Sequence, residues 1–94
     1  MTIVQFSALP GGDWIRDGLA DLEQGLETVP ALLVSVGATR LRAAGVAVPA
    51  SAFSDPERRL YERLAAEDSD SAHSRYNALI RLLVSFERAA ECVR

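Results

Sequence analysis

The sequence predicts an all-α fold, a small bundle of three or four helices with a long central C-terminal helix. Proline, glycine and Asp-Ser clusters divide the 94 residues into segments of 12 to 23 residues, which suit helices better than strands. Within these segments apolar residues recur three or four positions apart, as on one face of an α-helix. A chain of this length is expected to form one helical domain over residues 1–94.

Residues 1–12 are expected to form an extended arm, with a short strand at 2–6 as an open alternative because strand-forming residues are frequent there. A first helix is expected from Asp13, a good N-cap, to about Glu27. Gly18 and Gly25 indicate either a weak helix or a close contact with another helix, and the weak helix is preferred because glycine disfavours helix interiors. The apolar face of this helix consists of Ile15, Leu19, Leu22, Leu26 and Val29.

A second helix is expected from about Pro30 to Ala44, with Thr28 as a cap and Gly45 just past its end. The valine-rich run 31–36 also fits a buried strand. Helix is preferred because the segment is long and ends on helix-terminating residues.

A third helix is expected to begin at residues 54–57. Ser54 with Glu57 fits a capping box, and Asp55 with Pro56 is an equally good cap and first residue. The side chains expected to face inward are Leu60, Tyr61 and Leu64.

The last helix is expected from about Ser71 to Cys92 or beyond, and it carries two adjacent apolar stripes. A surface helix needs an apolar arc of roughly 100°, and this arc is wider. The helix is therefore either central, or one stripe contacts another chain. The predicted partner interface consists of Leu79, Leu82, Phe86, Ala89 and Val93.

Thirteen acidic residues outnumber ten basic ones, all of them arginine, and the net charge of −3 is a poor basis for non-specific nucleic-acid binding. The charge is uneven, with −4 on residues 1–29 and +2 on residues 30–63. A basic patch is expected to consist of Arg40, Arg42, Arg58, Arg59 and Arg63. Pairing of these arginines with the acidic first helix is preferred over phosphate binding.

No catalytic residues, cofactor or metal site are predicted. His73 and Cys92 lie 19 residues apart on one expected helix, which places them about 28 Å apart, too far to act together. The carboxylate pair Glu87 and Glu91 is expected on a solvated helix face. The serines lack a Gly-x-Ser-x-Gly elbow, and the Asp-Ser stretch at 68–71 is typical of a turn.

His73 is the basis of one hypothesis about function, a role in phosphotransfer or metal binding. Residues 72–77 resemble the phospho-accepting helix of histidine phosphotransfer domains. Tyr76 and Asn77 stand where that family has a basic residue and a small one, so the resemblance assigns no family.

The sequence favours a small cytoplasmic, non-catalytic protein of bacterial or phage origin that binds another protein as adaptor, inhibitor or regulator. The single Cys92 is expected to be a free thiol, and neither a secretory signal nor a membrane span is predicted. A homodimer is expected if no other protein partner is present. The alternative is a nucleic-acid-associated regulator that uses the arginine patch.

Overall fold

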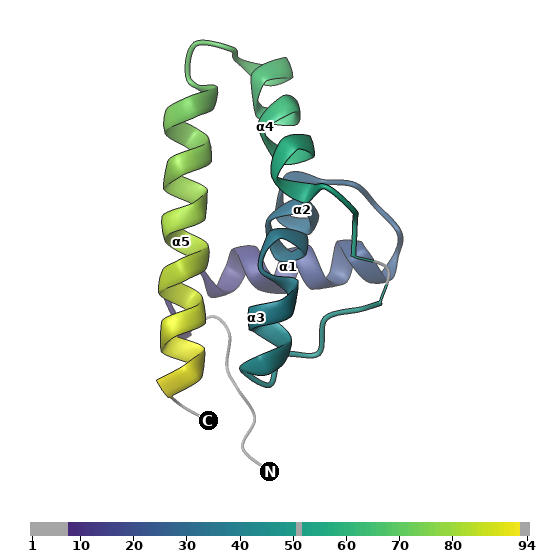
Figure 1. Ribbon diagram of the computed structural model, residues 1–94, viewed down its shortest axis with the longest axis vertical. Coiled ribbons are helices and arrows are strands. Elements are labelled where there is room, and N and C mark those ends of the chain that lie inside the picture. Colours follow the sequence, from purple (N-terminus) through teal and green to yellow (C-terminus); the bar gives the residue numbers. More distant parts are fainter. Residues whose placement is uncertain (1–7, 51, 93–94) are drawn as a thin grey trace.

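The computed structural model describes residues 8–50 and 52–92. Within these residues it contains five helices and no strand, so the predicted all-α class is confirmed. The helices are α1 (Gly12–Glu23), α2 (Val29–Val36), α3 (Ala38–Ala43), α4 (Pro56–Glu67) and α5 (Ala72–Cys92) (Figure 1). Residues 31–36 are helical rather than extended. The predicted arm lies mostly outside the described residues, as does the possible strand at 2–6.

The centre of the bundle is occupied by α2, which packs against all four other helices. Its residues Ala31–Val34 are 0% exposed. A helix without charged residues can be buried all round in this way. The longest helix, α5, was predicted to be central but runs beside α4 along one side of the molecule, while α1 crosses behind (Figure 1).

The contact between α1 and α2 depends on Gly18. A Cβ atom at this position would lie 2.3 Å from the carbonyl oxygen of Pro30 and 2.5 Å from Cγ2 of Val34. Glycine thus allows the two helices to approach closely. At Gly18 the preferred prediction of a merely weak helix was wrong, and the alternative of a close contact is correct.

The first helix also ends earlier than predicted. It stops at Glu23 because Gly25 adopts a left-handed conformation, with φ of 72°, which glycine accepts without strain. Leu26 consequently leaves the apolar face and is 46% exposed. The N-cap of α1 is Gly11, so Asp13 lies in the first turn instead of capping it.

The predicted helix 30–44 is divided at Gly37 into α2 and α3. A Cβ atom on Gly37 would lie 2.8 Å from Cδ1 of Leu83, so α5 packs directly against this break. The expected cap is present, because Oγ1 of Thr28 accepts a hydrogen bond from the backbone N–H of Ala31 at 3.2 Å. The buried Ser35 hydroxyl accepts from the N–H of Phe53 at 3.1 Å, which ties the loop before α4 to the central helix.

The start of α4 at Pro56 agrees with the prediction, but its N-cap makes no side-chain capping hydrogen bond. Asp55 has a positive φ of 50°, and its carboxylate instead accepts from Nε of Arg58 at 2.6 Å. Leu60 and Leu64 are buried as predicted. Tyr61 was predicted to face inward, but it is exposed.

Candidate functional site

Helix α5 has a buried strip with a partly exposed apolar edge on each side. The strip faces the core and consists of Ala72, Leu79, Leu83, Phe86 and Ala90. On one side Tyr76 and Ile80 are partly buried, and with Tyr61 of α4 they form what we call the tyrosine edge. On the other side Leu82 and Ala89 are partly buried and form the leucine edge. The apolar surface of α5 is therefore wider than the strip that the core uses.

The residues of the predicted partner interface fall into different environments. Leu79 and Phe86 are 8% and 0% exposed and belong to the core, so they are not available to another chain while the fold is intact. Leu82 and Ala89 leave part of their surface in solvent. Val93 lies outside the described residues. What remains of the predicted interface at the surface is the leucine edge.

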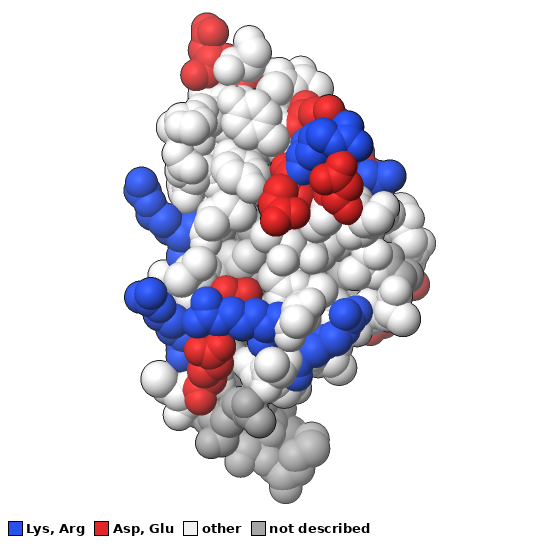
Figure 2. Space-filling model, viewed as in Figure 1, with Lys and Arg blue, Asp and Glu red and all other residues white. Residues whose placement is uncertain are grey.

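The sequence placed Tyr76 and Ile80 on an apolar stripe of the last helix, but it did not predict that they form an exposed edge with Tyr61. The ring centroids of Tyr61 and Tyr76 lie 5.7 Å apart with their planes at 59°, a tilted arrangement that aromatic pairs favour. Tyr61 is 39% exposed. Figure 2 shows a broad uncharged surface over α4 and α5, between two groups of charged side chains.

The five arginines of the predicted basic patch occupy two separate helices. Arg40 and Arg42 lie on α3, while Arg58, Arg59 and Arg63 lie on α4. Figure 2 accordingly shows two charged regions rather than one basic surface. The structure therefore does not bring these five residues together.

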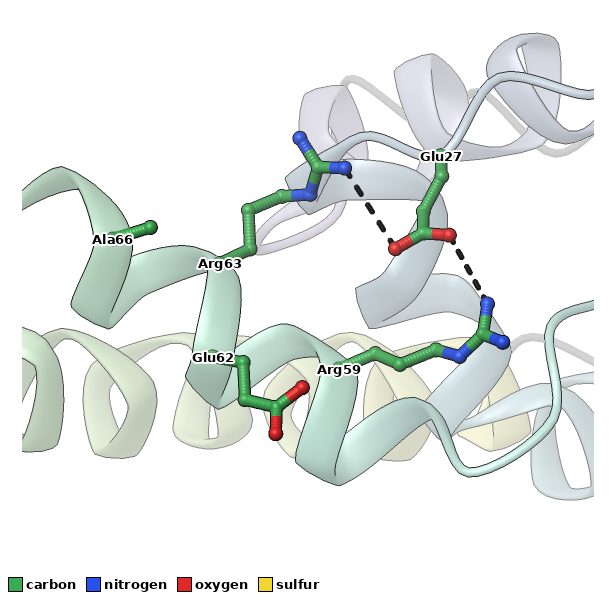
Figure 3. Close-up of a pocket in the computed structure, with 5 residues that line it drawn as sticks. All are labelled: Glu27, Arg59, Glu62, Arg63 and Ala66. Atoms are coloured by element: carbon green, nitrogen blue, oxygen red, sulfur yellow. Dashed lines mark hydrogen bonds and ion pairs between the residues drawn. The ribbon is translucent and has the colours of Figure 1, made fainter.

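In an open hollow beside α4, the carboxylate of Glu27 balances the charge of two arginines. Glu27 lies 3.0 Å from Arg59 and 3.7 Å from Arg63, and both guanidinium groups point toward its carboxylate (Figure 3). Glu62 and Ala66 complete the lining. An anion entering this hollow would have to displace Glu27, so the hollow is poorly suited to phosphate binding.

The remaining patch arginines are also paired within the chain. Arg58 contacts Asp55 and Glu62, and Arg42 donates to the backbone carbonyl oxygens of Val48 and Pro49 at 3.2 and 2.7 Å. The preferred prediction was pairing with the acidic first helix, but only Arg59 and Arg63 contact the acidic N-terminal segment, and they do so through Glu27, which follows α1. Exposed pairs of this kind contribute little to stability because solvent screens them. Their main effect is to neutralise the arginines.

A third charged cluster joins α3 to α5. The guanidinium group of Arg40 binds Glu91 through two hydrogen bonds of 2.8 and 3.1 Å, and it lies 3.3 Å from Glu87. Glu87 is only 4% exposed. A Cβ atom added to Gly37 would lie 2.7 Å from Oε2 of Glu87. The prediction that Glu87 is solvated was wrong, because glycine at the α2–α3 break leaves room for its side chain.

Burial raises the pKa of Glu87, and the nearby Arg40 opposes this effect. The charged carboxylate is therefore less favourable in the folded protein than in the unfolded chain. We expect the stability of the wild type, relative to a Glu87→Gln variant, to increase as the pH falls from 7 toward 4.5, the ordinary pKa of a glutamate side chain. Urea denaturation of both proteins at several pH values measures this difference.

Glu91→Gln is the matched control, because Glu91 contacts the same Arg40 but its side chain is exposed. If the wild type instead loses stability relative to Glu87→Gln as the pH falls, the Glu87 carboxylate is stabilised in its charged form and this explanation is wrong.

Two arginines on α5 differ from the rest. Arg16 binds Asp13 and Asp17, and Arg75 binds Glu67. Among the arginines that the structure describes, only Arg81 and Arg88 have a guanidinium group without a hydrogen bond or ion pair. Both are exposed. Each lies two residues from members of the buried strip, a rotation of about 200° on an α-helix. They therefore project away from the core.

The acidic stretch before α5 forms a turn. The carboxylate of Asp68 accepts a hydrogen bond from the backbone N–H of Asp70 at 3.1 Å, a typical turn contact. His73 is exposed, 3.2 Å from Asn77, near the opposite end of α5 from Cys92. Within residues 8–50 and 52–92, no group of three or more histidine, cysteine or acidic side chains is placed to hold a metal ion.

The described residues define a small helical bundle of five helices, and the longest of these helices has partly exposed apolar edges. Comparison with protein-family models, curated proteins and solved structures finds no match for this chain. None of the helices in the described part of the chain combines the length and apolar character needed to cross a membrane.

Proposed function

We propose that this chain is a non-catalytic protein-binding module, an adaptor, inhibitor or regulator that acts through the exposed edges of α5. The observation that supports this proposal is the width of the apolar surface on α5. The core uses the central strip, while Tyr76 and Ile80 on one side and Leu82 and Ala89 on the other remain partly exposed. Apolar and aromatic surface of this kind is a usual component of protein interfaces.

Nucleic-acid binding has less support. The five arginines predicted to form a basic patch are divided between two helices, and each has a partner within the chain. Phosphate contacts would have to replace these pairs on a protein with a net charge of −3. The free and exposed Cys92 thiol is compatible with the reducing, cytoplasmic location that we propose.

Native mass spectrometry of the tagged chain, gently captured from the cells that naturally make it, tests this function. We expect a complex of fixed ratio, containing either two copies of the chain or one copy and another protein. A charge within the contact should abolish it, so Ala89→Glu and Ile80→Glu test the two edges separately. Ala20→Glu introduces the same charge at an exposed position of α1 and should leave the complex intact.

Circular dichroism of each variant verifies that the helices are still formed. A wild-type chain that is found only as a monomer would contradict the proposal. So would a complex that survives both the Ala89→Glu and the Ile80→Glu substitution in folded protein.

A further inference from the structure

We propose that the leucine edge of α5 binds an acidic amphipathic helix from a different protein. This inference rests on the proposed protein-binding function and specifies the chemistry of the partner. It is carried by the position of two unpaired arginines beside a regularly spaced line of small and apolar side chains.

The spacing along this edge is that of a helix–helix contact. Ala78, Leu82, Ser85 and Ala89 follow one another at intervals of four, three and four residues. All four belong to α5, and each is partly or fully exposed. This alternation is the spacing at which side chains of two helices interdigitate. A second helix can therefore lie along the line over about three turns.

The two sides of this line are different. On the side toward the core, Leu82 touches the turn before α1, since a Cβ atom on Gly11 would lie 2.7 Å from Cγ of Leu82. On the open side, Arg81 precedes Leu82 and Arg88 precedes Ala89 in the sequence. Both arginines therefore flank the place where a second helix would lie.

The charge of this flank favours acidic residues in the partner. Arg81 and Arg88 are seven residues apart, about 10 Å along the helix. Guanidinium groups at flanking positions of a helix pair bind carboxylates of the facing helix and determine partner choice. Because no carboxylate of the described chain neutralises either arginine, a partner helix with acidic residues at the same interval is the complementary surface.

The described residues of the chain do not offer a free pair of acidic side chains at this interval. Two carboxylates seven positions apart occur at Asp55 and Glu62, around α4. Both already bind Arg58. A foreign helix thus fits this edge better than a helix of a second copy.

The test uses two synthetic peptides of about three heptads that form amphipathic helices. They are identical except that glutamate in one is replaced by lysine in the other at the flanking positions. Fluorescence anisotropy should show that the wild-type protein binds the glutamate peptide and that added salt weakens binding. The Arg81→Glu/Arg88→Glu double variant should lose at least about tenfold in affinity for it and should bind the lysine peptide instead.

Arg16→Glu is the control, because it reverses an exposed charge on a different helix, α1. Both substitutions on α5 affect side chains that point away from the core, so the double variant should remain folded. A single-stranded oligonucleotide of the same net charge as the glutamate peptide tests whether any polyanion suffices.

Three results would overturn this inference: equal affinity of the wild type and the double variant for the glutamate peptide, no binding of either peptide by the wild type, or tighter binding of the oligonucleotide. A native complex lost in Ile80→Glu but kept in Ala89→Glu and in the double variant would leave the protein-binding function standing and refute the acidic-helix site. Absence of any native complex would refute the function itself.

Discussion

Gly18→Ala is expected to destabilise the protein by about 2 kcal/mol or more, because a side chain at this position overlaps α2. The added Cβ atom would lie 2.3 Å from the carbonyl oxygen of Pro30 and 2.8 Å from its carbonyl carbon. Backbone atoms of a packed helix cannot move aside as the end of a flexible side chain can. The clash should outweigh the gain of about 1 kcal/mol that alanine brings to a helix interior.

Urea denaturation of Gly18→Ala and Gly25→Ala separates steric overlap from backbone strain. Gly25 has a positive φ of 72°, and a Cβ atom added there would meet no other atom within 4 Å. Its substitution should therefore cause only conformational strain of about 1–2 kcal/mol. A Gly18→Ala protein that is as stable as the wild type would show that α1 and α2 do not approach as described.

Phe86→Ala is expected to reduce the free energy of unfolding by about 3–5 kcal/mol, the range for removing a buried aromatic side chain. Phe86 is among the largest side chains that are completely buried. Domains of this kind are commonly stable by only about 5–15 kcal/mol, so the variant should unfold at much lower urea concentration. The loss should appear as reduced stability of the chain itself rather than as a weaker complex.

Tyr61→Ala provides the comparison, because it also removes an aromatic ring but from a side chain that is 39% exposed. Its effect on the free energy of unfolding should be clearly smaller. A Phe86→Ala protein with wild-type stability would place Phe86 at the surface, where the sequence-based prediction put it.

The starts of several helices were predictable because their signals are local. Pro56 at the start of α4, Thr28 before α2 and Ser71 before α5 follow from residues adjacent in the sequence. The break at Gly37 and the central place of α2 were not predictable in this way. Both depend on packing between segments far apart in the chain, such as Leu83 against Gly37.

In the candidate site, too, local features were predictable and features that depend on the packing of distant segments were not. Periodicity identified the wide apolar surface of α5, but it did not reveal which part faces the core, because Leu79 and Leu82 are equally apolar. The arginine partners were also hidden, since Glu27 and Arg59 lie 32 positions apart and meet only in the folded chain. The exposure of Tyr61 had a local signal, because it follows the buried Leu60 by one position and so lies about 100° around the helix.

The most direct test of the protein-binding account is to map amide chemical shifts of the isotopically labelled chain by NMR as it assembles, either with its captured partner or by concentration of the chain alone. If the account is right, the largest changes fall on the exposed edges of α5. The acidic-helix site further predicts that they fall on the leucine edge and its flank, at Ala78, Arg81, Leu82, Ser85, Arg88 and Ala89. Changes concentrated on α1 or on the loop between α3 and α4, with α5 unaffected, would contradict it.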